Sequence, residues 1–491
     1  MPQWIQEFYP VLILLAVVGF VFWCLPSIDV GHDKRYLRRR VMNWLPLGLT
    51  YAFLYMGRYN LKVSQYAFEE MAGPGGGPLM GNDAFSLIFM VGTIVYGISF
   101  VINGPLTDRL GGRVAMLIGT AGATAVNLLM GLAALSLVER GPLSEMLARN
   151  FLPVFSVLYA VNMYFQSFGA VAIVKVNAPW FHVRERGVFG AIFGILISLG
   201  VYFAFDIGDM ILGGLGLAWV FLVPALLLGL FWVIDWFIVR DSPAQAGLVD
   251  FNTGDATSGD SGPRMGAVAV FKKMLTNPII VTISLVEFCS GFLRQAIMQW
   301  YGSFAKQTDA ALGLRSSFVN ENWGLLLCIA GILGGVVAGF ISDHVFQSRR
   351  GPVAGFLYAV MLAGAVLLTF TYTTPIVGWL VVVMSMAVIG VHGMLSGTAS
   401  MDFGGAKNAG IAVGIIDGFV YLGTGTMSLL YTWILPKVEL SADGKLTGPA
   451  TDPANWVAWP ISMIPIAALG LFLALRLWNA KPKPKGSPAG H

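Results

Sequence analysis

The chain has 491 residues, of which 56% are hydrophobic and only 11% are charged, and its formal net charge is +4. Soluble domains carry roughly 25% charged residues, so this composition excludes a soluble protein and indicates one that crosses a membrane many times. The small net charge excludes nucleic acid as a partner. The three cysteines lie in apolar runs without metal-ligand spacing, which favours neither a disulfide framework nor a metal site.

In chain order, the apolar segments predict thirteen spans, because a span requires about 20 apolar residues. The first has no basic residue before it and no small-residue cleavage site, so we expect a retained helix rather than a signal peptide. The expected spans are 8–26, 42–66, 84–106, 114–137, 151–177, 187–213, 217–239, 278–303, 322–342, 352–373, 376–399, 409–436 and 457–477.

One long polar interruption, 240–277, divides the chain, and its segment DFNTGDATSGDSGPRMG has the composition of a flexible linker. The N-terminal half then covers 42–239 and the C-terminal half covers 278–478, with six expected helices each. An extra N-terminal transmembrane helix and a basic linker occupy 1–41, and a basic tail occupies 479–491. The expected fold is an all-α polytopic membrane protein with two six-helix halves related by pseudo-two-fold symmetry.

The basic loops predict the orientation. Clusters such as HDKRYLRRR and the C-terminal KPKPK fall on one side of the expected spans, whereas EEMAGPGGGPLMGND and LSADGKLTGPATDPAN, on the other side, are poor in Lys and Arg. Basic loops stay in the cytoplasm. The C-terminus is therefore expected to be cytoplasmic, in a multi-pass protein of the bacterial inner membrane.

Two arginines lie inside apolar spans, Arg58 in the first half and Arg294 in the second. An Arg at the bilayer centre costs roughly 3 kcal/mol on insertion scales, so such residues usually face a cavity or a partner. Asp108 follows the first Arg by 50 positions (58 to 108), and Asp343 follows the second by 49 (294 to 343). This spacing indicates two copies of one unit, whose site lies at mid-membrane between the halves.

The two Asp residues lie in polar loops of related sequence. The loop GPLTDRLGGR, with Asp108, Arg109 and Arg113, resembles the cytoplasmic loop motif of the major facilitator superfamily, and SDHVFQSRRG, with Asp343, is a weaker copy. We expect these residues to form a conformational latch that breaks when the cytoplasmic side opens, because the Asp can accept from a helix N-terminus and from basic groups.

Further groups accompany the arginines. An Arg offers a planar fork of donors that matches phosphate, so two of them could bind one phosphoryl group. An internal salt bridge to Glu287, Asp206 or Asp417 is the alternative explanation of the two intramembrane arginines.

His392 could titrate or bind substrate, although a structural histidine is the simpler interpretation. The other candidate substrate-binding residues share a helical face with Arg58 or add hydroxyls nearby: Tyr51, Tyr55, Lys62, Tyr96 and Tyr421.

Over nearly all of 42–477 the chain resembles the organophosphate:phosphate antiporters, a family that includes the glycerol-3-phosphate and hexose-phosphate transporters. The resemblance is carried by YAFLYMGRYN, WFHVRERG, FLRQAIMQWYGSFAKQ, SDHVFQSRRG and IGVHGMLSGTASMDFGGAKNAGIAVGIIDGFVYLG. It implies that Arg58 and Arg294 bind the phosphate and that Tyr51, Tyr55, Tyr96 and Tyr421 line the pathway.

The chain also departs from that family. Tyr59, counted here among the candidate substrate-binding residues, replaces a Lys that often follows the first Arg, and Phe100 replaces another Lys. Pro179 stands where a substrate-linked His is expected. These differences leave the organic part of the substrate open.

The expected function is exchange of an organophosphate for inorganic phosphate by alternating access, in a monomeric protein that needs no cofactor and is not an enzyme. Two alternatives stay open. One is a proton-coupled symporter or exporter of the same fold, with Glu287, Asp206 or Asp417 as proton carrier. The other is a membrane sensor that binds a phosphate ester without transporting it.

Overall fold

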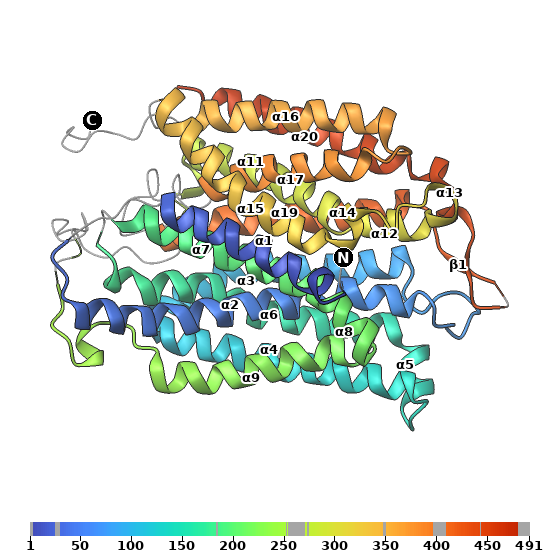
Figure 1. Ribbon diagram of the computed structural model, residues 1–491, viewed down its shortest axis with the longest axis horizontal. Coiled ribbons are helices and arrows are strands. Elements are labelled where there is room, and N and C mark those ends of the chain that lie inside the picture. Colours follow the sequence, from blue (N-terminus) through green and yellow to red (C-terminus); the bar gives the residue numbers. More distant parts are fainter. Residues whose placement is uncertain are drawn as a thin grey trace.

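The computed structural model describes residues 3–24, 30–182, 185–251, 253, 271–272, 274–346, 350–395, 409–441 and 443–479. Nearly all described elements are helices, and the long ones run along the longest axis of the molecule (Figure 1). They form two bundles, one from each half of the chain, as the sequence predicts.

The first bundle contains six long helical segments within the described chain. The fifth segment is interrupted by a π-helical turn, a local irregularity that often marks a functional position. The elements are α2 (Lys34–Phe68), α3 (Asn82–Leu110), α4 (Gly112–Val138), α5 (Ser144–Arg149), α6 (Phe151–Asn177), η1 (Ala178–Trp180), α7 (Arg186–Tyr202), the π-turn η3 (Phe203–Ile207), α8 (Gly208–Leu215), α9 (Trp219–Ile238) and η4 (Ala244–Ala246).

The second bundle repeats the pattern with six long segments and a small antiparallel hairpin, in which Glu439 faces Thr447 and Leu440 faces Leu446. Asn277 caps its first helix, and Pro278 occupies the first turn, where a missing N–H costs nothing. The elements are α11 (Pro278–Met298), α12 (Tyr301–Gln307), α13 (Asp309–Leu312), α14 (Phe318–Glu321), α15 (Trp323–Phe340), the π-turn η6 (Ile341–Val345), α16 (Arg350–Thr371), α17 (Val377–Met394), α19 (Ala409–Ile434), β1 (Glu439–Leu440), β2 (Leu446–Thr447), η9 (Pro449–Thr451), η10 (Pro453–Trp456) and α20 (Ala458–Arg476).

The two ends of the bundles carry different elements. The end with α5, α12 to α14 and the β1–β2 hairpin is called the hairpin end (Figure 1). The opposite end, called the linker end, includes the turn between α3 and α4 and the residues that lead into 240–277. Gly111 makes that turn with a φ of +86°, a conformation that favours glycine.

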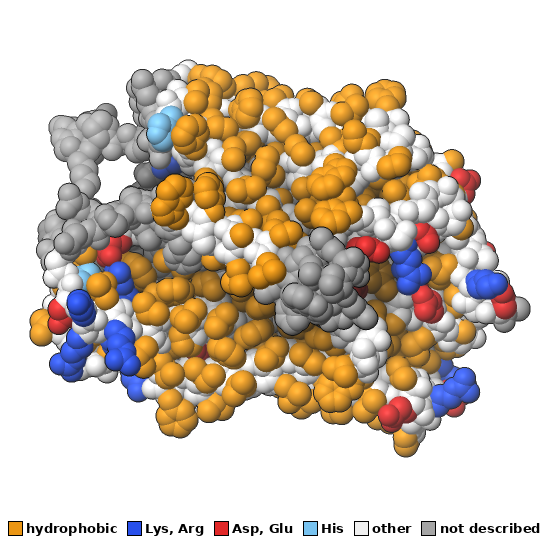
Figure 2. Space-filling model, viewed as in Figure 1, with side chains coloured by type: hydrophobic (Ala, Val, Ile, Leu, Met, Phe, Trp, Pro, Cys, Tyr) orange, Lys and Arg blue, Asp and Glu red, His pale blue; other side chains and the backbone are white. Residues whose placement is uncertain are grey.

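The surface is that of a membrane protein. Figure 2 shows a broad band of hydrophobic side chains over the middle of the molecule, with charged side chains gathered toward its two ends. Phe370 and Trp433, for instance, are each 79% exposed. Residues of this kind belong in lipid, so the chain is an integral, multi-pass membrane protein.

Fewer helices than expected are apolar enough to identify a span by composition alone. Ten of the described helices pass that criterion, against thirteen expected spans. The helix α2 misses it because Arg58, Lys62 and several tyrosines lower its hydropathy, and α1 (Gln3–Cys24) contributes only the shorter apolar stretch Leu12–Val21. Both α2 and α19 nevertheless pack inside the bundles and complete the six segments of each half.

The halves meet along two seams, where α3 packs on α19 and α7 packs on α15. The extra helix α1 crosses the second seam (Figure 1). Its buried residues Leu14 and Val21 pack with Ile195 of α7 and Leu325 of α15, among others. This helix therefore contacts both halves at once.

The helix α19 lies very close to α11. A Cβ atom added at Gly291 of α11 would collide with the backbone of Val420, and one at Gly423 would collide with the carbonyl oxygen of Phe288. Small residues allow such close approach of membrane helices. The approach brings Tyr421 of α19 to the centre of the molecule.

Candidate anion-binding site

Arg58 is almost completely buried in α2 and is held by three neutral side chains. Its Nε donates to Oε1 of Gln166 (3.0 Å), Nη1 donates to the hydroxyl of Tyr421 (2.8 Å) and Nη2 donates to the hydroxyl of Tyr96 (2.9 Å). These partners come from α6, α19 and α3, so three helices fix the guanidinium. Because none of them is an anion, the charge of Arg58 is oriented but not neutralised.

Tyrosine rings surround the same guanidinium. Its Cζ lies 4.5 Å from the ring centroid of Tyr55 and 4.5 Å from that of Tyr96, a distance suited to cation–π attraction. The rings of Tyr51 and Tyr55 are 5.3 Å apart, and those of Tyr55 and Tyr59 are 5.9 Å apart. The structure thus brings the predicted tyrosines together around Arg58.

Arg294 occupies the corresponding position in α11 and has a different environment. Its side chain is 8% exposed, and no hydrogen bond or ion pair from the described residues reaches the guanidinium, whose Nε is buried. Its electrostatic neighbours include Tyr55, Tyr59 and Tyr421. The hydroxyl of Tyr59 accepts from Nε2 of Gln295 (3.0 Å), which ties α2 to α11 beside the arginine. The two arginines therefore share a set of tyrosine neighbours.

The salt bridges considered for the arginines do not form among the described residues. Glu287, one of the three candidate partners, is fully buried and pairs with Nδ1 of His392, its Oε2 lying 2.8 Å away. Asp206 accepts from the backbone N–H groups of Gly324 (2.5 Å) and Leu325 (2.7 Å) at the first turn of α15. Glu287 and Asp206 thus have other partners, and the positive charge of the site is not compensated by them.

Lys62, one turn beyond Arg58, lies toward the hairpin end. Its Nζ donates to Oε1 of Gln65 (2.8 Å) and to Oγ of Ser303 in α12 (2.6 Å). It also lies 4.4 Å from the ring of Phe85 and 4.5 Å from that of Trp300. In this conformation Lys62 contributes to the contact between the halves and does not reach the hydrogen-bond partners of Arg58.

A polar network continues this contact at the hairpin end. Lys306 of the second half lies 3.2 Å from a carboxylate oxygen of Glu70 and 3.9 Å from one of Glu69. Gln307 donates to Glu69 (2.8 Å) and to Asn82 (2.9 Å). The hydrogen bonds that join the halves on the hairpin side of Arg58 close that end of the site.

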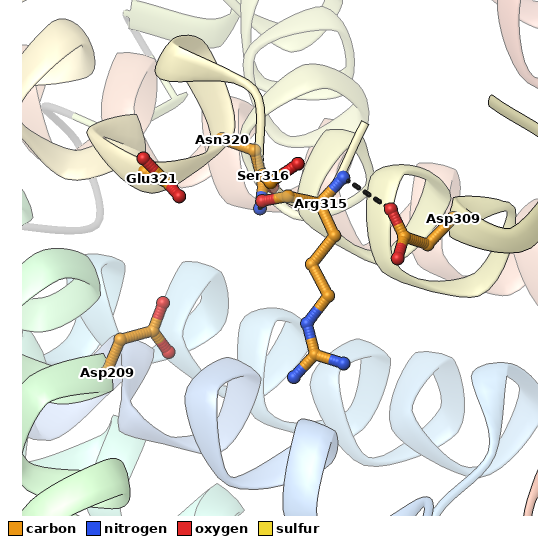
Figure 3. A pocket seen from close by; sticks show the side chains of 6 residues that line it. All are labelled: Asp209, Asp309, Arg315, Ser316, Asn320 and Glu321. Atoms are coloured by element: carbon orange, nitrogen blue, oxygen red, sulfur yellow. Dashed lines mark hydrogen bonds between the residues drawn. The ribbon is translucent and has the colours of Figure 1, made fainter. Parts of the chain in front are cut away.

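Two cavities of about 410 and 550 Å³ open at the hairpin end, and neither includes Arg58 or Arg294. Figure 3 shows the smaller one, in which the side chain of Arg315 extends from the second half toward the helices of the first, where Asp209 lies. The larger cavity is lined by residues of both halves, including Tyr66, Lys306 and Trp323. The larger cavity borders the polar network at Lys306.

The predicted latch residues lie at the linker end. Asp108 pairs with Lys175 of α6 (2.7 Å), and both side chains are about half exposed. The backbone N–H of Arg113, at the start of α4, donates to Asp241 (2.7 Å), so Asp241 caps this helix. Arg113 also donates to the carbonyl oxygen of Trp236.

The other two latch residues form no described bond of this kind. Arg109 is exposed. Asp343 belongs to η6, but its side chain lies outside the described residues.

Sequence reasoning missed several residues that support the site. Gln166 accepts a hydrogen bond from Arg58, and Gln295 donates one to Tyr59. Ser303 accepts a hydrogen bond from Lys62. Each of these residues is a polar residue among apolar neighbours in its helix, and this position could have indicated a buried hydrogen bond. Gln166 lies outside the segments that carry the resemblance, whereas Gln295 and Ser303 lie within one of them, FLRQAIMQWYGSFAKQ.

The model of the Major Facilitator Superfamily matches residues 47–427. The chain belongs to this superfamily. One relative of this chain is the membrane sensor protein UhpC of Salmonella typhimurium, 25% identical over 435 residues, which cover 84% of this chain and 87% of that protein. Another is the glycerol-3-phosphate transporter of Bacillus subtilis, 24% identical over 472 residues, or 92% of this chain and 95% of the transporter.

Among solved structures, the chain is similar to a bacterial homologue of the human lysosomal transporter Spinster. Its inward-facing, unoccupied form has a TM-score of 0.61, with 14% sequence identity over 92% of this chain and 100% of that one. At this identity the likeness concerns the fold alone. The relatives named above confirm the predicted resemblance to the organophosphate transporter group.

Proposed function

We propose that this protein is a secondary active transporter that exchanges an organophosphate for inorganic phosphate. The observation that carries the proposal is the state of the two arginines. Arg58 is oriented by neutral groups only, and Arg294 is buried without a partner among the described residues. A buried cation that lacks an anion is costly, so the pair is suited to an anionic ligand.

The ligand in this proposal is a phosphoryl group. Its oxygens accept from the free donors of Arg294 and from those donors of Arg58 that its tyrosines release, and the planar forks fit phosphate better than a point charge would. The name of the Bacillus subtilis relative supports this choice. Tyr51, Tyr55, Tyr59, Tyr96 and Tyr421 form the wall, and Lys62 and His392 lie on either side of the arginines along the pathway.

Obligatory exchange follows from the same charges. An empty site that closes must bring two cations out of water without an anion, and both desolvation and repulsion oppose this step. The loaded carrier reorients readily because the phosphate neutralises the pair.

In this mechanism the hairpin end is extracytoplasmic, and the linker end, with the C-terminus, is cytoplasmic. This orientation agrees with the basic residues Arg38 and Arg40 near the linker end. The protein works as a monomer in the inner membrane.

Uptake of labelled phosphate into liposomes tests the proposal. Vesicles with the protein are preloaded with phosphate or with buffer, and wild type is compared with Arg58→Lys and Arg294→Lys, which retain charge but lose the fork. We expect uptake only into phosphate-loaded vesicles and a loss of about 100-fold or more in each variant. Folded wild-type protein that exchanges no phosphate contradicts the proposal.

A sensor is the second candidate function, favoured by the similarity to UhpC. A sensor would bind phosphate or a phosphate ester through the same arginines but would move none across the membrane. Binding measured on purified protein, set against the flux into liposomes, separates the two functions.

A further inference from the structure

Glu287 carries an acceptor that the proposed mechanism does not use. Its carboxylate is completely buried, Oε2 contacts His392 of α17 (2.8 Å), and Oε1 has no hydrogen-bond partner among the described residues. A buried carboxylate oxygen without a donor is unusual, because native structures pair nearly all buried polar atoms. The ring of His392 is 23% exposed, so the pair is not sealed from the space beside it.

Glu287 and Arg294 lie on one face of α11. They are seven residues apart, which places them two helical turns apart along the same side, about 10.5 Å between backbone positions. Arg294 presents an unpaired donor at Nε and Glu287 an unpaired acceptor at Oε1. No ion pair joins the two side chains within the described structure. One face of α11 therefore offers a donor and an acceptor for two different groups of one ligand.

We infer that Glu287, oriented by His392, is the subsite for the organic part of the substrate and binds a hydrogen-bond donor on it. This inference rests on the proposed function, because it takes Arg294 as the phosphate-binding end. The donor is a hydroxyl or an ammonium group on the organic part of the substrate. The carbon chain that carries it extends from the phosphate along one to two helical turns of α11. Alkyl phosphates without a donor leave Oε1 of Glu287 unpaired and bind more weakly.

His392 is a positioning residue in this arrangement. Its Nδ1–H donates to Oε2 of Glu287, which leaves Oε1 free for the ligand. Among the described residues, the other titratable groups near Glu287 include Arg294 and Cys289 on its own helix and Tyr358 of α16. The hydroxyl of Tyr358 donates to the carbonyl oxygen of Val286 (2.5 Å), so it does not serve Glu287.

A series of three-carbon phosphate esters tests the inference. Purified wild-type protein is titrated with propyl phosphate, glycerol 1-phosphate and 3-aminopropyl phosphate, which differ chiefly in the donors that they carry, and with the longer sorbitol 6-phosphate. Affinity is measured by thermal shift and by calorimetry. We expect at least one donor-bearing ester to bind about 10- to 100-fold more tightly than propyl phosphate, as for a hydrogen bond to a charged group. Comparison of glycerol 1-phosphate with 3-aminopropyl phosphate identifies whether Glu287 binds a hydroxyl or an ammonium group.

The variant Glu287→Gln keeps the shape of the side chain and removes its charge. We expect it to reduce the preference for the donor-bearing ester to within about threefold of propyl phosphate. The matched control is Asp235→Asn, which alters another buried carboxylate, bound to Thr50 (2.7 Å) in the first half. The control is expected to retain the wild-type preference, even if it lowers stability.

The outcomes separate the two proposals. Wild type that binds all esters equally, or a preference that survives Glu287→Gln, overturns the subsite while leaving phosphate exchange untouched. Wild type that prefers the donor-bearing esters but shows no phosphate exchange in liposomes overturns transport and keeps the subsite. Loss of binding to every ester, propyl phosphate included, in folded Glu287→Gln shows a general role in the site and also overturns the inference.

Discussion

The hydroxyl of Tyr421 accepts a hydrogen bond from Nη1 of Arg58 (2.8 Å), and this bond joins the second half of the chain to the first at a charged residue that is only 1% exposed. The ring of Tyr421 also lies 4.1 Å from that of Tyr96, which binds the other terminal nitrogen of the same guanidinium. A conformational change that separates α19 from α3 must therefore release a donor of Arg58. A phosphate oxygen can occupy the released donor.

Replacement of Tyr421 by Phe tests this coupling. The variant leaves one buried N–H of Arg58 unpaired, so we expect unliganded protein to lose about 1–3 kcal/mol of stability. Added phosphate satisfies that donor, and the thermal shift that it produces should exceed the wild-type shift. The control is Tyr431→Phe on the same helix, whose hydroxyl contacts Ser462 (2.9 Å) away from the arginines. An equal phosphate shift in all three proteins contradicts the coupling.

Lys306 is expected to stabilise the closed hairpin end. Its side chain is only 10% exposed, and Nζ lies 3.2 Å from a carboxylate oxygen of Glu70. Nζ also donates to the carbonyl oxygen of Tyr66 (2.5 Å) in α2 of the other half. Lys306→Met removes these links, so the population open at the hairpin end should rise about fivefold or more, as for a loss of about 1 kcal/mol or more.

The opening can be measured as a distance between spin labels. Labels at Leu143→Cys and Phe318→Cys, in a background without native cysteines, report on exposed positions in the two halves near the hairpin end. Lys445→Met, which removes an exposed pair with Asp443 (3.2 Å), is the control and should not change the distance. If both variants give the wild-type distance distribution, Lys306 does not control this end.

The pair Asp108 and Lys175 should contribute little to stability in the conformation described here. The two side chains are 50% and 46% exposed, and exposed ion pairs are worth about 0–1 kcal/mol. We expect Asp108→Asn to lower the free energy of unfolding by less than about 1 kcal/mol, and the difference should shrink as salt is raised. A slower exchange rate in the same variant, at unchanged stability, is the result that supports a conformational latch.

Gly291 is required for the close packing of α11 and α19. A Cβ atom at this position collides with the backbone of Val420, which cannot rotate away as a side chain could. Gly291→Ala is expected to cost about 1–3 kcal/mol or more and to lower the yield of folded protein. Gly335→Ala in α15 is the control, because no atom lies within 4 Å of its added Cβ. Size-exclusion profiles and melting temperatures of the two variants decide the matter, and equal values argue against this packing.

The extra helix α1 is expected to stabilise the seam between α7 and α15. The double variant Leu14→Ala and Val21→Ala removes its buried contacts with both halves, whereas Leu12→Ala with Leu15→Ala changes residues that are 62% and 61% exposed. Core truncations of this kind cost about 2–5 kcal/mol per Leu when fully packed. We therefore expect a lower melting temperature for the first double variant alone. Equal melting temperatures would show that α1 does not support the seam.

Sequence alone predicted the two halves, since apolar length and basic loops report directly on membrane spans. It also selected Arg58, Tyr96 and Tyr421 together, because a charge in an apolar span is conspicuous and the resemblance implies that both tyrosines line the pathway. It did not anticipate the pairing of Glu287 with His392, since that contact links positions 105 residues apart and depends on how α11 packs against α17. Helical spacing shows which face a residue shares, but not which helix lies opposite.

Polar residues inside the bundles were the hardest to interpret. Gln166, Gln295 and Ser303 are ordinary residues in sequence, and their roles follow only from partners on other helices. Lys62 lies on the predicted face but extends toward Ser303, because the closed hairpin end supplies a partner there. The boundaries of the linker at 240–277 and of the C-terminal tail stay predictions.

The cap that Asp206 places on α15 connects the two halves of the chain at the hairpin end. A carboxylate of the first half accepts two backbone N–H groups of the second, at Gly324 and Leu325, so separation of the hairpin end leaves a helix terminus and a carboxylate to be rehydrated together. Under the proposed function, such a barrier slows the opening of the hairpin end and lengthens the time that the site spends closed on that side. The opening of the hairpin end, more than the binding of counter-substrate, would then set how often the carrier turns over.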